Sequence, residues 1–247
     1  MSVTGGSWDT AERFGRPVRH FPIAVSAEAL ALAWARQEQG PQGATVIVDR
    51  EISPIGRQGR LWGTPPEATL ASAVVLRPPL SVEEADASWL VVSLAAAEGA
   101  EAVTGKELQT WWPDAVVEPT SGEPVGTVKA EVQLGPGQVR SAVVTVRLDL
   151  SKLGLEGTQR DELLEAVLSA LDGWAARLDN GATELAAAYE SRCRQMGRRV
   201  RVQLRPKGET RGTVSHIGRT AHLELKSATG MVERVTIDQL RDLAVVG

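Results

Sequence analysis

Hydrophobic and polar positions change their spacing several times along this 247-residue chain, and each change predicts a new element. Residues 27–39 carry apolar side chains at helical spacing behind Ser26, a preferred helix cap, so a helix is expected there. Residues 44–49 and 70–77 are short apolar runs, which indicate buried strands. A capping-box pattern over residues 81–84 predicts a second helix that runs to about residue 98.

Strict alternation replaces the helical spacing in the middle of the chain. Residues 125–134 and 139–150 alternate apolar with polar side chains on either side of a Gly-Pro-Gly turn. This pattern predicts a hairpin with one buried face. An exposed strand over 139–150 would let two copies of the chain pair edge to edge, so a homodimer through this strand is one expectation.

Two helices and a compact β region complete the pattern. A cap formed by Thr158 and Asp161 opens a helix with a continuous apolar stripe, and a second helix follows a break at Asn180-Gly181. Short alternating runs separated by glycines begin at residue 197 and predict a small antiparallel barrel.

The predicted fold class is therefore α+β: a mixed sheet with helices packed on it, followed by a small β-barrel. We expect a flexible polar arm over residues 1–19, a main domain over 20–196 and the β-barrel domain over 197–247.

Composition narrows the function. The net charge is −4, which argues against a nucleic-acid partner. A single cysteine, Cys193, allows no internal disulfide, and three scattered histidines with that cysteine suggest no metal site. No apolar run is long enough to cross a membrane, and the N-terminus lacks the apolar core of a signal peptide. A cytoplasmic protein without a membrane partner is expected.

The strongest chemical signal is the segment Gly56-Arg57-Gln58-Gly59-Arg60-Leu61-Trp62. Glycines let the backbone approach an anion, and arginine supplies a planar, permanently charged fork. By itself the segment fits an ordinary solvated turn between two strands better than it fits an anion loop.

The order of motifs around this loop resembles the biotin protein ligases of the biotin/lipoate ligase superfamily. Their anion loop ends in a similar Gly-Arg-x-Trp. The further matching segments are Thr64-Pro65, Leu76-Arg77-Pro78, a Lys-Trp-Pro-Asn-Asp-like box over residues 111–116, a glycine-containing strand over 124–128, and closing helices with a Gly-Arg-Arg-Val entry into an SH3-like barrel over 174–201.

The resemblance implies an α/β ligase domain with a C-terminal SH3-like barrel. It implies an ATP-dependent reaction that joins biotin to a carrier lysine through an adenylate, with biotin and ATP/Mg as ligands. The implied partner is an acidic biotin-carrier or lipoyl-type domain. The implied ligand-binding and anion-binding residues are Gly56, Arg57, Gly59, Arg60, Trp62, Trp111, Trp112 and Gly126.

Several positions depart from the pattern of the family, and the departures remove positive charge. The lysine expected before the glycine-containing strand is Glu123, and the leading lysine of the box is Trp111. The last aspartate of the box is Ala115. Since fixed cations offset the charge of a transferring phosphate, their loss favours a degenerate pseudo-ligase. Lys129 is the one candidate for a substitute catalytic lysine.

Other departures fall where the family lines its ligand pocket. The glutamine ahead of the anion loop is Glu51, and one arginine of the loop aligns with Ile55. The Gly-x-Gly-Ile-Asn strand is Thr145-Val146-Arg147-Leu148-Asp149, and the Ser-Thr-Asn that opens the first helix is Val25-Ser26-Ala27.

Three classes of function remain open. The first is a pseudo-ligase that binds a small carboxylic acid, an adenylate-type ligand or a carrier protein. The second is an active ligase for biotin or another acid, with Lys129 recruited to the site. The third is a structural or dimerisation protein. A basic cluster between Arg192 and Arg211 is either a solvated face or a dock for an acidic partner, and Cys193 is expected to be a buried apolar residue.

Overall fold

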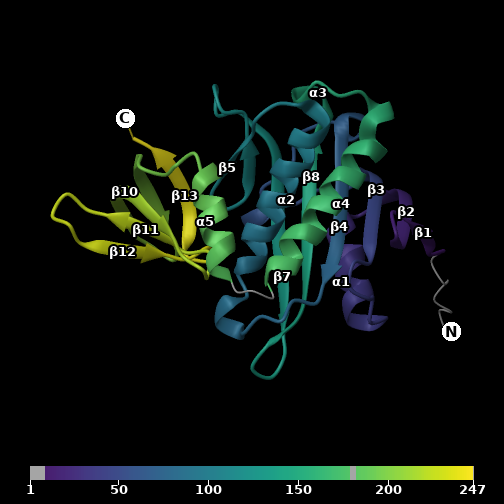
Figure 1. The fold of residues 1–247 in the computed structure, drawn as a ribbon, viewed down its shortest axis with the longest axis horizontal. Coiled ribbons are helices and arrows are strands. Elements are labelled where there is room, and N and C mark those ends of the chain that lie inside the picture. The colour runs from purple at the N-terminus through teal and green to yellow at the C-terminus, as the bar shows by residue number, and fades with distance from the viewer. Residues whose placement is uncertain (1–8, 179–181, 247) are drawn as a thin grey trace.

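The computed structural model describes residues 9–178 and 182–246, which form two sheets and five helices (Figure 1). The first sheet has eight strands in the order β1-β2-β3-β4-β8-β7-β6-β5. Its strands are β1 (Ala11–Arg13), β2 (Arg16–Ala24), β3 (Thr45–Glu51), β4 (Thr69–Leu76), β5 (Gln109–Trp111), β6 (Ala115–Val117), β7 (Pro124–Leu134) and β8 (Val139–Asp149). The helices are α1 (Ala27–Gln37), α2 (Ala87–Thr104), α3 (Leu150–Leu153), α4 (Arg160–Arg177) and α5 (Ala182–Arg192).

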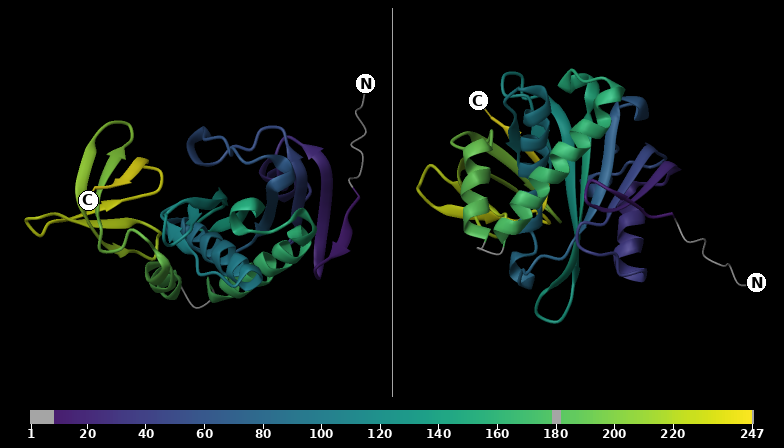
Figure 2. Two further views of the ribbon diagram at one scale, coloured as in Figure 1. Left: turned by 90° about the horizontal axis from the view of Figure 1, so that it is seen from above. Right: turned by 45° about the vertical axis from the view of Figure 1, so that its right-hand side comes forward.

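The second sheet has five antiparallel strands in the order β12-β11-β10-β9-β13 and stands to one side of the first (Figure 2). Its strands are β9 (Arg199–Leu204), β10 (Glu209–Ile217), β11 (Leu223–Lys226), β12 (Val232–Val235) and β13 (Leu240–Val245). The predicted mixed sheet with helices and the separate C-terminal β module are both confirmed. The first strand of the second sheet begins two residues beyond the predicted boundary at 197.

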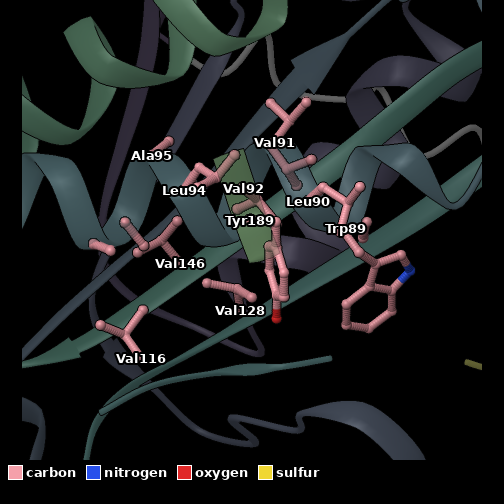
Figure 3. Packing of buried hydrophobic residues seen from close by; sticks show 14 of the residues in the cluster. Trp89, Leu90, Val91, Val92, Leu94, Ala95, Val116, Val128, Val146 and Tyr189 are labelled. Atoms are coloured by element: carbon pink, nitrogen blue, oxygen red, sulfur yellow. The ribbon is translucent and has the colours of Figure 1, made fainter. Parts of the chain in front are cut away.

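One face of the large sheet packs against α2 and α4 (Figure 1). Side chains such as Leu90 and Leu94 of α2 meet Val128 and Val146 of the sheet (Figure 3). The two helices cross closely at Gly99, where a Cβ atom would lie 2.5 Å from the Val167 Cα atom. This face is an apolar core, in which Ser88 and Ser93 of α2 are also buried.

The opposite face packs against α1. Trp34 of this helix lies over Val46, Val75 and Val143 of the central strands. Ser26 caps the helix as predicted, and its Oγ atom accepts a hydrogen bond of 3.1 Å from the Ala29 N–H. The first turn of α1 therefore lies over Glu51 of β3 and Arg147 of β8.

Four local predictions need correction. The capping-box residues 81–84 form a 3₁₀ turn over Val82–Glu84, and α2 itself spans Ala87–Thr104, beyond the predicted end at 98. The capping box that precedes α4 belongs to Glu156 and Gln159 instead of Thr158 and Asp161. The predicted break at Asn180-Gly181 touches residues outside the described ranges.

The third correction concerns the hairpin. β8 is buried on both faces because α1 covers the side that the alternation left polar, and β8 lies between β4 and β7. A central strand has no free edge, so the predicted homodimer contact through residues 139–150 is wrong. The fourth concerns the N-terminal arm: residues 11–24 form β1 and β2 of the large sheet, so the arm predicted for residues 1–19 is wrong from Ala11 onward.

Within the described residues, none of the helices is both long and apolar enough to span a bilayer.

Candidate functional site

A cavity of about 200 Å³ lies where the Gly/Arg loop, the tryptophan box and the start of β7 meet the last strand of the second sheet. Its walls therefore come from both sheets. The lining residues that the sequence predicted are Gly56, Arg57, Arg60, Trp62, Trp111 and Trp112. Asp114, Thr127, Leu240 and Asp242 also line it.

Arg57 has two internal partners at this cavity. Its side chain is only 7% exposed, and its Nε atom donates a hydrogen bond of 2.9 Å to Asp114 Oδ2. Its Nη1 atom donates a hydrogen bond of 2.8 Å to the Leu240 carbonyl. These two contacts use two of the five guanidinium N–H donors, and burial of the side chain restricts the access of a ligand anion to the others.

The rest of the Gly/Arg loop binds the same strand. Arg60 Nη2 lies 3.2 Å from Asp242 Oδ1 and donates a 3.1 Å hydrogen bond to the Arg241 carbonyl. The Gln58 side-chain amide donates to the Leu240 carbonyl. Gln58 and Gly59 have φ values of 58° and 76°, so the loop turns back through two left-handed residues to make these contacts. The loop therefore fastens β13 to the large sheet.

The tryptophans have different roles. Trp62 and Trp111 line the cavity and are partly exposed, and Trp62 Nε1 donates to Thr69 Oγ1 at 3.1 Å. Trp112 is 1% exposed, and its Nε1 atom donates to the Ala221 carbonyl of the second sheet at 2.8 Å. Trp112 thus anchors the two sheets to each other in addition to bordering the cavity.

Gly126 does not line the cavity. A Cβ atom at this position would lie 2.4 Å from Leu148 Cδ2 and 2.9 Å from the Arg147 carbonyl, its neighbours on β8. Close packing of β7 on β8 explains the glycine without a ligand.

Three positions at which the sequence departs from the family come together beneath α1. Arg147 of β8 and Glu51 of β3 form a bidentate ion pair with distances of 2.5 Å (Nε to Oε2) and 2.9 Å (Nη2 to Oε1). Their side chains are 2% and 4% exposed. Glu51 Oε1 also accepts a 2.8 Å hydrogen bond from the Ala27 N–H at the start of α1. The small Ala71, opposite Arg147 on β4, leaves room for the guanidinium.

Two features make this pair a stable closed unit. Bidentate pairing satisfies both partners with good geometry, and the N-terminus of α1 adds a favourable dipole for the carboxylate. Removing one partner of a buried ion pair strongly destabilises the protein, because the other charge stays buried without a partner. The pair occupies the space between the sheet and the first turn of α1, and neither side chain lines the cavity described above.

A second charged unit lies beside the first. Lys129 Nζ lies 2.7 Å from Glu28 Oε1 of α1 and 2.8 Å from Glu131 Oε1 of β7. Burial alone would lower the pKa of Lys129, but hydrogen bonds from the ammonium to Glu131 and Glu28 outweigh it and raise the pKa above its ordinary value. Lys129 is therefore held as a cation by two acids and does not line the cavity.

Glu123 lies away from the cavity. Its side chain is 60% exposed, and its Oε1 atom lies 2.8 Å from Lys152 Nζ. The charge repulsion expected from the sequence at this position is therefore weakened by a neighbouring cation and by solvent.

The sequence offered a partial signal for the residues it missed. Glu51 and Arg147 were both noted as departures, and their opposite charges at two positions of one implied pocket indicate a pair. Asp114 lies in the box over residues 111–116, but nothing in the sequence pairs it with Arg57. Leu240 and Asp242 gave no signal, because a carbonyl or carboxylate that binds an arginine from another sheet has no fixed sequence spacing.

No metal centre is evident in the described part of the chain, which holds no group of three or more His, Cys, Asp or Glu residues arranged to bind an ion. Cys193 is buried, and burial raises the pKa of its thiol to about 11. As predicted, it is a buried residue.

The fold is that of the biotin protein ligases. The biotin protein ligase of Aquifex aeolicus, solved with biotin and ATP, superposes with a TM-score of 0.73 at 16% identity, over 93% of this chain and 99% of that one. A biotin protein ligase-like protein of unknown function from a Silicibacter species gives a TM-score of 0.62 at 18% identity, over 87% and 93% of the two chains. Identities this low establish the shared fold alone.

Among curated proteins, the bifunctional ligase/repressor BirA of Bacillus spizizenii is 22% identical over 112 residues, and that of Bacillus subtilis is 21% identical over 112 residues. The match covers 45% of this chain but only 34% of each relative. No family model matches the chain.

Proposed function

We propose that this chain is a biotin protein ligase-like protein that does not biotinylate and that acts by binding a partner protein. The fold and the order of its motifs support the superfamily. The ion pair between Arg147 and Glu51 carries the rest of the proposal.

The pair supports the proposal because its two residues lie at positions that line the ligand pocket in the family. The resemblance aligns Arg147 with a pocket glycine and Glu51 with a pocket glutamine. In this chain both side chains are buried, and each satisfies the other. An arginine side chain where the family has only a hydrogen atom fills the space that a bicyclic ligand needs. Breaking the pair to admit biotin would leave two buried charges without partners, which costs about 3–5 kcal/mol. The residues present therefore do not fit biotin, and no catalytic step is derived through it.

The residues implied to bind the nucleotide also support the loss of ligase activity. A transferring phosphate needs free cations, and both family lysines are absent. Arg57 and Arg60 are held by Asp114 and Asp242. Lys129 is held by two glutamates away from the cavity. Every cation that the resemblance assigns to the reaction thus already has a carboxylate partner within the chain.

An open hollow of about 540 Å³, lined by Arg57, Gly59 and Lys129, adjoins the Gly/Arg loop, and the cavity beside the tryptophan box is the smaller of the two. Its volume is about 200 Å³, below the range of roughly 300–1,000 Å³ that is usual for sites that enclose a drug-sized molecule. The smaller cavity therefore suits a small acid better than a biotinyl adenylate, which supports a protein partner.

Pyrophosphate release tests the loss of activity. The full chain is mixed with ATP, Mg²⁺ and either biotin or one of a panel of small carboxylic acids. We expect no acid-dependent release above the protein-free rate. The Arg57→Ala variant is the matched control for contaminating ATPases, since contaminant activity is the same in both preparations. Acid-dependent release that disappears in Arg57→Ala would overturn the proposal.

A further inference from the structure

The second sheet carries a basic face that the proposed site does not use. Arg199 and Arg201 of β9, Arg211 of β10 and Lys226 of β11 lie on its outer side, because the alternate residues Val200, Val202 and Val214 are buried. We call these four residues the basic face.

Strand register fixes how close the four cations lie. Arg201 is directly opposite Arg211, and Thr213 lies between Arg199 and Lys226 in the next row. Directly opposite residues are about 4.5–5.5 Å apart at Cβ, and alternate residues of a strand are about 7 Å apart. The basic face is therefore a compact group in two adjacent rows.

Within residues 9–178 and 182–246, the basic face has few internal partners. Arg211 pairs with Glu209 at 2.7 Å, while no carboxylate lies within ion-pair distance of Arg199, Arg201 or Lys226. Directly opposed like charges destabilise a sheet. In a chain of net charge −4, this unneutralised group faces solvent at a cost to stability.

We propose that the basic face binds an acidic protein segment whose carboxylates alternate along an extended strand. Three of the four cations are arginines, whose planar forks match carboxylates in bidentate geometry. A strand with acids at every second residue repeats the same spacing of about 7 Å. Residues 199–246 contain no Phe, Tyr or Trp, so the face lacks the aromatic platforms on which single-stranded nucleic acids stack.

The basic face adjoins the candidate site, which connects the two proposals. Gln203 of β9 is opposite Asp242 of β13, and Asp242 lines the cavity and pairs with Arg60. A partner seated on the basic face would lie beside the mouth of the cavity. The inference rests on the proposed function in one respect: it describes the chemistry of the partner protein proposed there. The charges and the strand register of the basic face do not depend on that proposal.

Fluorescence anisotropy with the full chain tests the proposal at low ionic strength. The probe is a labelled octapeptide of alternating Glu and Thr. The comparison probes are the same peptide with Gln for each Glu, and a dT oligonucleotide of equal charge. The test variants are R199E/R201E and the milder R199Q/R201Q. The matched control is R36E/R140E, two exposed arginines outside the second sheet for which the described structure has no ion pair.

We expect the glutamate peptide to bind wild type and the control equally. We expect about tenfold weaker binding by R199E/R201E and a smaller loss for R199Q/R201Q. The glutamine peptide and the oligonucleotide should bind at least about tenfold more weakly than the glutamate peptide. Absence of peptide binding, equal loss in the control, or equal affinity for the oligonucleotide would each overturn the proposal. Pyrophosphate release by R199E/R201E should equal that of wild type, so this test and the test of the proposed function fail separately.

Discussion

The two faces of the large sheet show two ways to fill the same kind of space. Beneath α2 and α4 the filling is predominantly apolar, and close packing and the release of water stabilise it. Beneath the first turn of α1 the filling is ionic, with Arg147 on Glu51 and Lys129 on Glu28. An apolar core tolerates the loss of one side chain in proportion to the cavity left. An ionic core is balanced only while every partner is present.

The largest changes in the free energy of unfolding are expected from substitutions at two neighbouring residues of β8, one on each face. Arg147→Ala leaves the Glu51 carboxylate buried without its cation and should lower the free energy of unfolding by about 3–5 kcal/mol. Leu148→Ala, on the apolar face, should cost about 2–5 kcal/mol through a cavity. Urea denaturation of both variants measures the two costs. A cost below about 1 kcal/mol for Arg147→Ala would show that the ionic filling has no structural role.

A second difference between the faces is what determines the pKa of a titrating side chain. Cys193 belongs to the apolar cluster, and burial raises the pKa of its thiol from 9.0 to about 11. The thiolate fraction at pH 8 is then about a hundredfold lower than that of an unperturbed thiol. Alkylation by iodoacetamide at pH 8 should be slower in the folded chain by at least this factor than in urea-unfolded chain. Native alkylation within about tenfold of the unfolded rate would contradict apolar burial of the thiol.

On the ionic face the partners outweigh burial. Lys129→Met removes an ion pair with Glu28 and another with Glu131, and should cost about 1 kcal/mol at pH 7, because the site is partly exposed to solvent. The folded pKa of Lys129 is raised, so its contribution is complete below the unfolded pKa of about 10.4 and is lost as pH rises through the folded value. Urea denaturation at pH 7 and pH 10.5 compares the variant with wild type. A difference that grows with pH would contradict this assignment.

The smallest change is expected when both partners of the buried pair are replaced together. Arg147→Met with Glu51→Met removes both charges while it keeps much of the volume, and such exchanges are often neutral or stabilising. Urea denaturation should give a free energy of unfolding near that of wild type. A loss as large as that of Arg147→Ala would show that the charges themselves, rather than their mutual balance, hold this end of the sheet.

The two faces also differ in how well the sequence predicts them. Spacing located the apolar face, since Trp89, Val92, Val128 and Val146 follow helical or alternating periods, and it placed α1 behind Ser26. Alternation misjudged β8, because Thr145, Arg147 and Asp149 are polar residues that suggest a solvent face but lie beneath α1. The spacing of apolar and polar residues shows which side chains share a face of a strand. It does not show which other element covers that face.

The sequence predicted that residues of the Gly/Arg loop and of the tryptophan box would lie together, but not which partners they would bind. Arg57, Arg60, Trp62 and Trp111 do meet at one cavity. Asp114 of the large sheet binds Arg57, and the Leu240 carbonyl binds it only because β13 docks on the loop. Contacts between two sheets separated by more than a hundred residues leave no local pattern from which to predict them.

Calorimetric titration with biotin tests the central claim, that the buried Arg147–Glu51 pair fills the ligand pocket of the fold. Wild-type chain is compared with R147G/E51Q, which restores the glycine and glutamine of the family pattern. We expect no saturable heat with wild type and measurable binding by the double variant. Saturable binding of biotin by the wild-type chain would contradict the account.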